Sequence, residues 1–482
     1  MLCYSGKELQ EYIEKETERT WKQRDFLTDL DLYLKRTRTE VLGISGLRGT
    51  GKTVGLLQFL KDKNGVYICA QIGDDKTVND YIELLKTIPN DIIVLDEYPW
   101  IKGSNKDELD AFLYTLTQNG KKVIITGTES IAIDALQAEK LIHRIKIVNV
   151  NHFSYDEYCR MNDLEKNKEN CKQYLMKAGV FPQYIVNSFQ SMINYVKNAV
   201  SDNLTFHMKG LDKEKAAAIV YTILYKAVCD SAIKFVPQIK ENRETIESFL
   251  NEIGVDSEIE FTNFDFQRVS SVLIDAGVII SVPNYENNEE FRTYIVNPAL
   301  TYQMLCAVHH LEDLPDKFKK SLYGYMFEAS CVVHINQQLC NTGWGEDKLY
   351  YMYKKEGDNQ SEIDFLIENT SKHSDIYLFE CKLNDGAVVK EKSSLVSDFT
   401  ENLFAKEIGG RYAVYNGPHN FDVINDKEIL YVGMDNLLSQ YYSFSANKAT
   451  ILQEVKDRGE LTYLEEKQRI LEQKKKTKRP RL

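Results

Sequence analysis

The sequence predicts an α/β fold whose N-terminal part is built on a parallel sheet, and three observations support this prediction. Between Val41 and about Val150, short apolar segments alternate with helical stretches, as in βαβ units. The first apolar segment leads into a glycine-rich turn at residues 46–53, and that turn opens a helical stretch. The chain has 482 residues, which is too long for one ordinary core, so about two to four domains are expected.

The glycine-rich turn reads Gly-Leu-Arg-Gly-Thr-Gly-Lys-Thr and fits the phosphate-loop pattern. Its glycines allow successive N–H groups to face an anion at the N-terminus of the following helix. Lys52 can reach the β- and γ-phosphate oxygens, and the Thr53 hydroxyl can ligate Mg²⁺. The alternative is an incidental glycine-rich turn. The predicted nucleotide-binding residues are Gly46, Leu47, Arg48, Gly49, Thr50, Gly51, Lys52 and Thr53.

The apolar segments supply the strands of the predicted sheet in order. Residues 1–40 are polar and compatible with helix, so we expect a pair of helices there that packs onto the first domain. The expected strands are Val41–Ser45, Gly65–Gln71, Asp91–Asp96, Lys122–Thr126 and Ile145–Val150.

Two acids follow the apolar strand Ile92-Ile-Val-Leu, at Asp96 and Glu97. Acids at the carboxyl end of a buried strand lie at the crevice where α/β sheets bind ligands. Asp96 would hold Mg²⁺ through its water shell, and Glu97 would polarise the attacking water. The alternative is a strand that runs out into a solvated acidic turn. Together with the phosphate loop, the two acids predict an ATPase that uses ATP and Mg²⁺.

Two further residues are candidates for this site. Thr128 follows the strand that ends at Thr126, where a hydroxyl can orient water against the γ-phosphate, or can simply cap the next helix. Arg144 precedes the last strand and could stabilise transition-state charge in its own site or in that of a neighbouring copy. A surface arginine is the alternative for Arg144.

Composition narrows the class of protein. The chain is 43% hydrophobic and 27% charged, which is typical of a soluble globular protein and not of a disordered one. Its net charge of −12 argues against wholesale wrapping of nucleic acid but allows a local basic footprint. The nine cysteines have no zinc-type spacing, no signal peptide is evident and no apolar run is long enough to span a bilayer. We therefore expect a cytoplasmic protein with reduced thiols.

The region after the first domain is predicted to be helical and then to form a different unit. Residues 153–210 look helical, including Tyr155–Met161 and Glu169–Ala178. Three helices and a β-hairpin between Glu214 and about Gln303 then make a winged-helix arrangement. Its third helix, Phe264–Ala276, would be the reader in a DNA-binding version. The surrounding acids make poor chemistry for a phosphate backbone, so packing or protein contact is the alternative.

Residues 315–440 predict a third unit with its own sheet. Expected are a helix at 317–338, strands near 348–354, 361–368 and 376–383, a helix at 388–406, and strands at 411–415 and 429–432. The chain ends in a charged helix and the basic tail Lys474–Arg481, which is either a solvated end or a nonspecific nucleic-acid tether.

The third unit contains a second group of candidate catalytic residues. Strand periodicity places Glu380 and Lys382 on the same face, and pairing of their strand with the strand of Asp364 would bring Asp364 near Glu380. The two carboxylates would then chelate Mg²⁺, and the lysine would activate a water for phosphodiester attack. The alternative is an exposed ion pair on an amphipathic hairpin.

Several of these segments resemble an AAA-type P-loop ATPase family of bacteria and archaea. The matching pieces are the phosphate loop with Arg48, the strand ending Val-Leu-Asp96-Glu97, the segment Thr-Gly-Thr128-Glu-Ser, and the stretches from Arg144 to Glu157 and from Tyr174 to Pro182. The family usually has Gly before the arginine, where this chain has His143. The resemblance covers almost the whole chain.

The resemblance implies a helical lid, a winged helix and a C-terminal domain like the PD-(D/E)xK nuclease superfamily, with αβββαβ order. Glu328 matches the additional acid of that superfamily. The expected domains are 1–152 for the P-loop ATPase with its helical arm, 153–213 for the lid, 214–310 for the winged helix, 311–440 for the nuclease-like domain and 441–482 for the charged helix and tail.

The sequence therefore leaves two functions open. The first is an ATPase whose motion acts on a nucleic acid, such as DNA, engaged by the C-terminal domain. The second is an ATP-gated switch that contacts a protein partner through the winged helix and has a catalytically silent nuclease-like domain. Both share the ATPase, and both allow a homo-oligomer.

Overall fold

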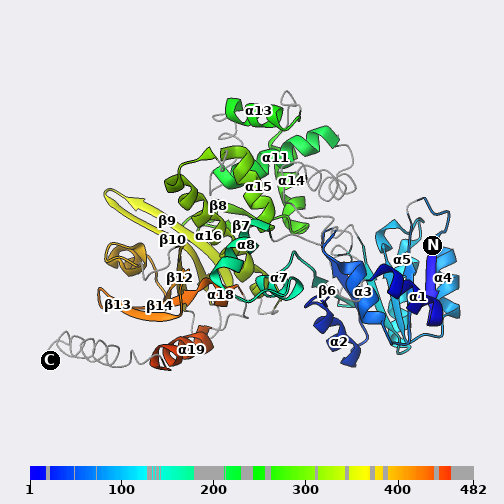
Figure 1. The fold of residues 1–482 in the computed structure, drawn as a ribbon. Coiled ribbons are helices and arrows are strands. Elements are labelled where there is room, and N and C mark those ends of the chain that lie inside the picture. The colour runs from blue at the N-terminus through cyan, green and yellow to red at the C-terminus, as the bar shows by residue number, and fades with distance from the viewer. Residues whose placement is uncertain are drawn as a thin grey trace.

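The structure is a computed structural model, and it describes most of the chain. The described residues are 1–17, 22–47, 49–71, 73–127, 133, 136, 141, 143–177, 191, 211, 213–229, 243–255, 262–309, 313–341, 347–369, 375–383, 389–438 and 444–457. Among them are two six-stranded sheets and one two-stranded sheet (Figure 1).

The first sheet has the strand order β1-β3-β4-β5-β2-β6. All neighbouring strands are parallel except β1, which pairs antiparallel with β3. Central parallel strands are covered on both faces, which explains their unbroken apolar sequences. The strands are β1 (Leu2–Ser5), β2 (Val41–Ser45), β3 (Gly65–Cys69), β4 (Ile92–Asp96), β5 (Lys122–Thr126) and β6 (Ile145–Asn149).

Helices cover both faces of this sheet. Apolar residues of α1, α2 and α3 pack on one face against alternate residues of the strands, and those of α4 and α5 pack on the other face. The capping box of Thr77 and Asp80 fixes the start of α4. The bounds are α1 (Gly6–Glu16), α2 (Leu27–Lys35), α3 (Lys52–Leu60), α4 (Val78–Thr87), η1 (Tyr98–Trp100) and α5 (Lys106–Gln118).

The five predicted parallel strands are confirmed, with ends that differ by at most two residues. The helix pair expected in residues 1–40 is also present, but the expectation of helices alone was incomplete. Residues Leu2–Ser5 form the edge strand β1. Its buried and exposed residues alternate over only four positions, which is too short a pattern to distinguish from a helix start in the sequence.

Between residues 155 and 309, the described residues form mainly helices and one hairpin. Strands β7 and β8 pair antiparallel from Ile279↔Ile295 to Pro283↔Phe291. The bounds are α7 (Tyr155–Met161), α8 (Lys168–Lys177), α11 (Lys213–Cys229), α13 (Arg243–Glu252), α14 (Asn263–Asp275), β7 (Ile279–Pro283), β8 (Phe291–Ile295) and α15 (Pro298–His309).

The second sheet is mixed and has the order β13-β14-β12-β11-β10-β9. The long helix α16 packs on the face that carries Phe365 and Phe379, within the largest apolar cluster. The elements are α16 (Asp316–Asn341), β9 (Lys348–Glu356), β10 (Asn359–Glu368), β11 (Ile376–Lys382), η5 (Ser394–Val396), α17 (Asp398–Asn402), β12 (Ile408–Tyr415), β13 (Asn420–Ile424), β14 (Lys427–Gly433), α18 (Met434–Leu437) and α19 (Phe444–Asp457).

The helix expected at 388–406 is wrong for its described part. Residues 389–393 and 397 are not helical there, and only the short elements η5 and α17 form. The hydroxyls of Ser393 and Ser397 accept from the backbone N–H of Leu395 and Phe399, at 3.1 and 3.2 Å. Such local bonds compete with a continuous helix. Strand β13 was also not predicted.

The hairpin β7–β8 packs against the second sheet. The Tyr285 N–H donates to the Tyr351 carbonyl at 2.8 Å, and Lys354 forms an ion pair with Glu286 at 2.8 Å. The loop after β7 therefore lies beside the edge strand β9, with a parallel bridge between Asn284 and Tyr351. The end of β7 and the loop that follows it are therefore packed against β9.

The two halves meet around α7. Figure 1 shows α7 between the first sheet and the rest of the chain. Tyr155 of α7 belongs to the apolar cluster that continues through α11, α16 and the second sheet, and so does Leu47. The turn after β2 is therefore anchored in the core of the C-terminal half.

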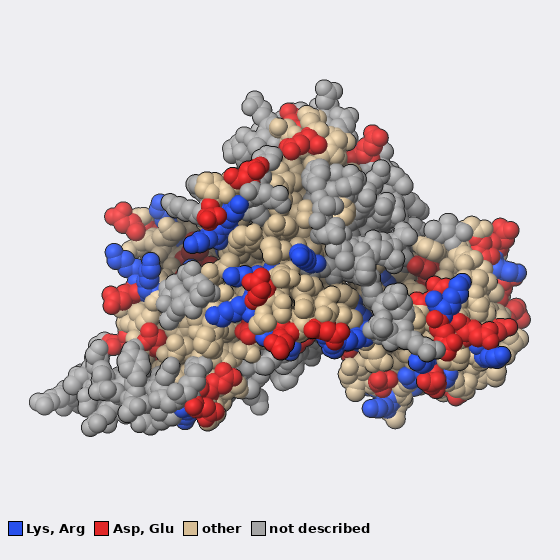
Figure 2. Space-filling view, in the orientation of Figure 1, with Lys and Arg blue, Asp and Glu red and all other residues tan. Residues whose placement is uncertain are grey.

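The surface has mixed charge. On the face in Figure 2, the Lys and Arg side chains of the described residues are interspersed with Asp and Glu, without one continuous basic area. Free thiols are found at Cys3, Cys69, Cys159, Cys171, Cys229, Cys306, Cys331 and Cys381. Within those ranges, every helix is too short or too polar to cross a bilayer.

Candidate functional site

The predicted phosphate loop lies between β2 and α3, at the carboxyl edge of the first sheet. Gly49 and Gly51 have φ angles of 82° and 85°, in the left-handed region that favours glycine. Gly46 is required for another reason, because a Cβ there would lie 2.2 Å from the Val150 carbonyl oxygen. Arg48 lies outside the described residues. The backbone of the loop is therefore the tight turn that the sequence predicted.

Lys52 begins α3 and its ammonium lies inside the loop. The side chain is nearly fully buried, and Nζ donates to the carbonyls of Gly46 and Leu47, the latter at 2.9 Å. Burial lowers the pKa of Lys52 to about 8, although Glu97 and Asp96 act to raise it. The ammonium is thus held where it could donate to an anion bound by the loop.

Asp96 lies directly opposite the start of α3. Its carboxylate accepts from the Thr53 hydroxyl at 2.7 Å, from the Tyr67 hydroxyl at 2.7 Å and from the Glu97 N–H at 2.9 Å. The structure therefore brings Thr53 and Asp96 together, as predicted for a shared Mg²⁺ site. Tyr67 was not predicted, and burial followed by the charge of Asp96 raises its pKa, so it stays a hydroxyl donor.

Glu97 follows β4 in a left-handed conformation, with φ 54°. This conformation turns the chain sharply at the strand end, and it is uncommon for a residue other than glycine. The Glu97 carboxylate lies beside Gly127, the residue that follows β5. Its Oε2 would be 3.6 Å from a Cβ atom added to Gly127. Thr128, the next candidate, lies outside the described residues. The Thr126 hydroxyl donates to the Ile44 carbonyl at 2.9 Å within the sheet.

Arg144 is not brought to the loop. It precedes β6, and Val41 pairs with Ile145, so Arg144 lies at the amino edge of the sheet while the loop follows Ser45 at the carboxyl edge. Five strand residues separate the two edges, on the order of 16 Å. The exposed guanidinium lies 4.8 Å from the ring centroid of Tyr114. His143 has φ 59°, in the left-handed region that favours glycine.

A cavity of about 370 Å³ adjoins the loop. Ser45, Gly46 and Asn151 line one side, and the turn between α14 and β7, with Asn336 and Gln337 of α16, lines the other side. The loop therefore faces residues of the C-terminal half across this cavity. A larger cavity of about 1030 Å³, near α17 and β14, is lined by none of the candidate residues.

The second group of candidates is also brought together. Strands β10 and β11 pair antiparallel with Phe365 opposite Phe379, which places Asp364 beside Glu380. The register of β10 against β9 shifts between Ile363 and Leu366, so Asp364 lies in an irregular segment. Bulges of this kind re-aim side chains and are frequent near functional sites.

Asp364 is half-buried in this cluster. Its carboxylate accepts from the Cys381 N–H at 2.6 Å. Burial raises the pKa of Asp364 well above its usual range, and the charges of Glu328 and Glu380 raise it further. Three carboxylates thus lie within one another's field.

The other members of the cluster have internal partners. Lys382 forms an ion pair with Glu380 at 2.7 Å, and the Ser393 hydroxyl donates to Glu380 at 2.5 Å. Burial acts to lower the pKa of Lys382, but Glu380 and Asp364 outweigh it, so the pKa is raised and the lysine stays charged. Among the described residues, no group of three or more His, Cys, Asp or Glu is arranged to hold a metal ion.

Glu328 is held by the hairpin strand β8. It accepts from the Tyr294 hydroxyl at 2.8 Å, and Arg292 lies 3.7 Å away while also pairing with Glu362 at 2.8 Å. Burial raises the pKa of Glu328 despite Arg292. Neither Arg292 nor Tyr294 was predicted, because both lie in a segment far from Glu328 in the sequence.

Comparison with known proteins supports the first site. Residues 38–159 match the AAA domain family. No curated protein matches this chain.

Among solved structures, the Thermotoga maritima RuvB Holliday junction branch migration motor is 14% identical, with a TM-score of 0.28, over 64% of this chain and 96% of that chain. The Aeropyrum pernix ORC1 protein in complex with DNA is 11% identical, with a TM-score of 0.23, over 58% of this chain and 90% of that chain. The loop at 46–53 lies within residues 38–159, the part of the chain that matches the AAA domain family.

Proposed function

We propose that this protein binds and hydrolyses ATP with Mg²⁺ at the phosphate loop. The observation that carries the proposal is the 2.7 Å contact between the Thr53 hydroxyl and the Asp96 carboxylate, beside the buried ammonium of Lys52. A hydroxyl, a carboxylate and a lysine at the carboxyl edge of a parallel sheet are the groups that a metal-bound triphosphate requires. The match of residues 38–159 to the AAA domain family agrees with this proposal.

The residues present fit the nucleotide. The N–H groups of the loop and of the first turn of α3 would bind phosphate oxygens, and Lys52 would exchange its two carbonyl acceptors for phosphate oxygens. Thr53 and Asp96 would hold Mg²⁺, which neutralises phosphate charge when bound.

Glu97 is the proposed general base. Its carboxylate would accept a proton from a water molecule whose oxygen forms the new bond to the γ-phosphorus, while the bond to the β-γ bridging oxygen breaks to release ADP. The left-handed backbone at Glu97 orients its side chain toward the end of β5, where we propose that Thr128 helps to orient the same water.

We further propose that the ATPase is coupled to a nuclease-like domain that acts on nucleic acid. The proposed units are a helical lid at 153–213, a winged helix at 214–310 and a PD-(D/E)xK-like domain at 311–440. The order α11, α13, α14, β7, β8 and the order α16, β9, β10, β11, α17, β12 support the last two assignments. The proximity of Asp364, Glu380 and Lys382 supports a shared site on the second sheet, in which the carboxylates would hold Mg²⁺.

The central claim is tested by ATP hydrolysis in three variants of the full chain. Lys52→Ala should abolish turnover, and Glu97→Gln should lower it by at least about 100-fold while ATP binding remains. Glu83→Gln is the matched control, since Glu83 is an exposed acid of α4 that pairs with Lys86. Unchanged hydrolysis in Lys52→Ala would refute the proposal, and near-normal hydrolysis in Glu97→Gln would remove Glu97 from its role.

The second candidate function is an ATP-gated switch with a silent nuclease-like domain. Two observations favour it: the hairpin β7–β8 is packed against β9, and Glu380 is already engaged by Lys382 and Ser393. A cleavage assay on DNA and RNA with Mg²⁺, with and without ATP, separates the candidates. Cleavage that is lost in Asp364→Ala and Lys382→Ala supports the first candidate, and an inactive wild type supports the second.

A further inference from the structure

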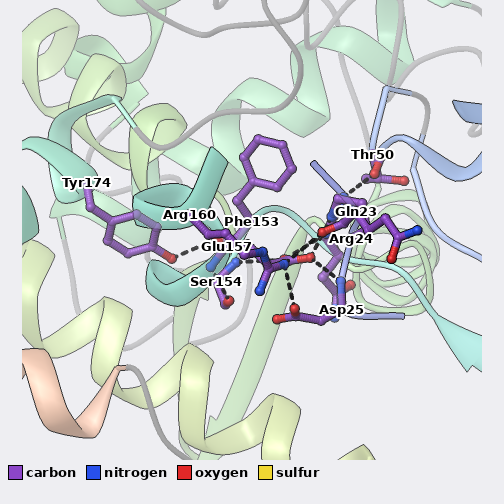
Figure 3. A network of polar contacts seen from close by, with 10 residues as sticks. Gln23, Arg24, Asp25, Thr50, Phe153, Ser154, Glu157, Arg160 and Tyr174 are labelled. Atoms are coloured by element: carbon purple, nitrogen blue, oxygen red, sulfur yellow. Dashed lines mark hydrogen bonds and ion pairs between the residues drawn. The ribbon is translucent and has the colours of Figure 1, made fainter. Parts of the chain in front are cut away.

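A buried arginine outside the phosphate loop contacts three separate segments. Arg24 lies between α1 and α2 and is 5% exposed. Its Nε and Nη2 donate to the two carboxylate oxygens of Glu157 at 2.7 and 3.0 Å, and Nη2 also donates to the Asn151 carbonyl at 2.9 Å. Its Nη1 donates to the Thr50 carbonyl inside the loop (Figure 3). The guanidinium thus joins the N-terminal arm, the loop and α7.

Glu157 is placed for this contact by the start of its helix. It is the third residue of α7, and it closes the capping box with Ser154. The carboxylate also accepts from the Asp25 N–H at 2.8 Å, so both oxygens are engaged. Burial acts to raise the pKa of Glu157, but Arg24 and the other donors outweigh it and the pKa is lowered. The pair therefore stays ionised at neutral pH.

The contact with Thr50 bears on how the loop would bind phosphate. In a planar trans peptide the C=O of Thr50 and the N–H of Gly51 point in opposite directions. Holding the Thr50 carbonyl on Arg24 therefore turns the Gly51 N–H away from Arg24. Gly51, with φ 85°, directly precedes Lys52, where the N–H groups of a phosphate loop converge on the anion.

Helix α7 also belongs to the core of the C-terminal half. Tyr155 lies two residues before Glu157 and is fully buried. It belongs to the same apolar cluster as Leu47 of the loop. The Tyr174 hydroxyl of α8 donates to the Phe153 carbonyl at 3.0 Å, just before α7. The segment that carries Glu157 is thus fixed to the C-terminal half.

We propose that Arg24 and Glu157 act as positioning residues that hold the phosphate loop in its binding conformation and couple it to α7. Through this pair, nucleotide bound at the loop stabilises the placement of α7, and the C-terminal half in turn sets nucleotide affinity. The proposal rests on ATP binding at the loop, as argued above. Neither residue is assigned contact with the reacting atoms.

The test compares Arg24→Lys with Arg160→Lys in the full chain. Arg160 is the matched control because it also joins α7 to the N-terminal arm. It donates to Asp25 at 2.6 Å and to the Gln23 carbonyl at 2.9 Å, but it is exposed and does not reach the loop. Lysine at position 24 keeps the charge but lacks the planar fork of donors with which Arg24 reaches Glu157, Asn151 and Thr50. We expect the Kd for ATP to rise about tenfold to a hundredfold in Arg24→Lys and less than about twofold in Arg160→Lys.

Hydrogen exchange separates positioning from a structural role. In the wild type, ATP should slow exchange of the α7 amides, and this effect should be lost in Arg24→Lys, measured well below its melting temperature. If Arg24→Lys does not fold, Glu157→Gln serves instead, since glutamine keeps the capping geometry but loses the charge. A wild type that binds no ATP refutes the proposed function. A wild type that binds ATP, with equal Kd and equal exchange in both arginine variants, overturns the coupling.

Discussion

The two acidic sites of this protein differ in how their carboxylates are neutralised. At the first sheet, the donors that the structure describes for Asp96 are the uncharged hydroxyls of Thr53 and Tyr67 and one backbone N–H. At the second sheet, Glu380 pairs with Lys382, and Glu328 lies near Arg292. Uncharged donors orient a carboxylate without cancelling its charge, whereas an internal cation cancels it.

The site at the first sheet is therefore the one prepared to bind an external cation. Uncharged donors orient the Asp96 carboxylate beside the loop, so a metal-bound nucleotide would gain from it directly. At the second sheet the gain is offset, because Lys382 must give up Glu380 before a cation can use that carboxylate. Asp364 is the exception there, since burial and two neighbouring carboxylates raise its pKa. Changes at Lys52, Asp364 and Arg144 test this difference between the two sites.

The largest expected effect is a pH dependence of nucleotide affinity. Burial lowers the pKa of Lys52 to about 8, and bound phosphates would favour the charged ammonium. ATP binding should therefore take up a proton above pH 8, and the Kd should rise by up to about tenfold per pH unit there. Without nucleotide, pH has the opposite effect on stability. In the unfolded chain Lys52 has its usual, higher pKa and stays protonated to a higher pH, so the free energy of unfolding rises as pH increases above about 8.

Titration calorimetry between pH 7 and 9.5 measures this effect. Lys52→Met is the control, because it should bind weakly and without the steep pH slope. The same slope in wild type and Lys52→Met would show that another group titrates.

Much of the first sheet and its site could be predicted from the sequence because the signals are local. The loop glycines, Lys52 and Thr53 are consecutive, and Asp96 ends a strand whose apolar run is unmistakable. A strand end fixes which edge of the sheet an acid occupies, so the meeting of Thr53 and Asp96 followed from topology. The pairing of Asp364 with Glu380 was predictable for a similar reason, namely the period of two in a strand.

The remaining features depend on contacts between distant segments. Arg24 and Glu157 are 133 residues apart, and only the capping box at Ser154 gave a local signal. Arg292 and Tyr294 reach Glu328 because the hairpin β7–β8 packs on the second sheet, which no local pattern shows. The partial burial of Asp364 likewise depends on packing between distant segments, so the sequence suggested an exposed ion pair as the alternative.

A smaller effect is expected for Asp364→Asn. Asparagine can still accept from the Cys381 N–H but removes the negative charge beside Glu328 and Glu380. At pH 7 without divalent cations, the free energy of unfolding should rise by about 1 kcal/mol, since one pKa unit corresponds to about 1.4 kcal/mol. The sign follows from a raised pKa: the wild type loses stability as pH rises above the unfolded value, and the variant does not.

Thermal unfolding measures the change, with Asp358→Asn, an exposed acid of the β9–β10 turn, as the control. Mg²⁺ added without nucleotide should then stabilise the wild type and not Asp364→Asn if the cluster holds metal. A loss of stability in Asp364→Asn at pH 7 would show that the charge of Asp364 is already compensated.

The smallest expected effect is for Arg144→Ala. The guanidinium lies at the opposite edge of the sheet from the loop and packs on Tyr114, a contact worth about 0.5–1 kcal/mol at an exposed position. ATP turnover should change by less than about twofold at low protein concentration, where one copy acts alone. A deficit that appears only as the concentration increases would assign Arg144 to the site of a neighbouring copy, because only an assembled neighbour can bring this edge to a loop. A large deficit at every concentration would contradict the placement of Arg144, since no arginine on the order of 16 Å from the loop can stabilise charge there.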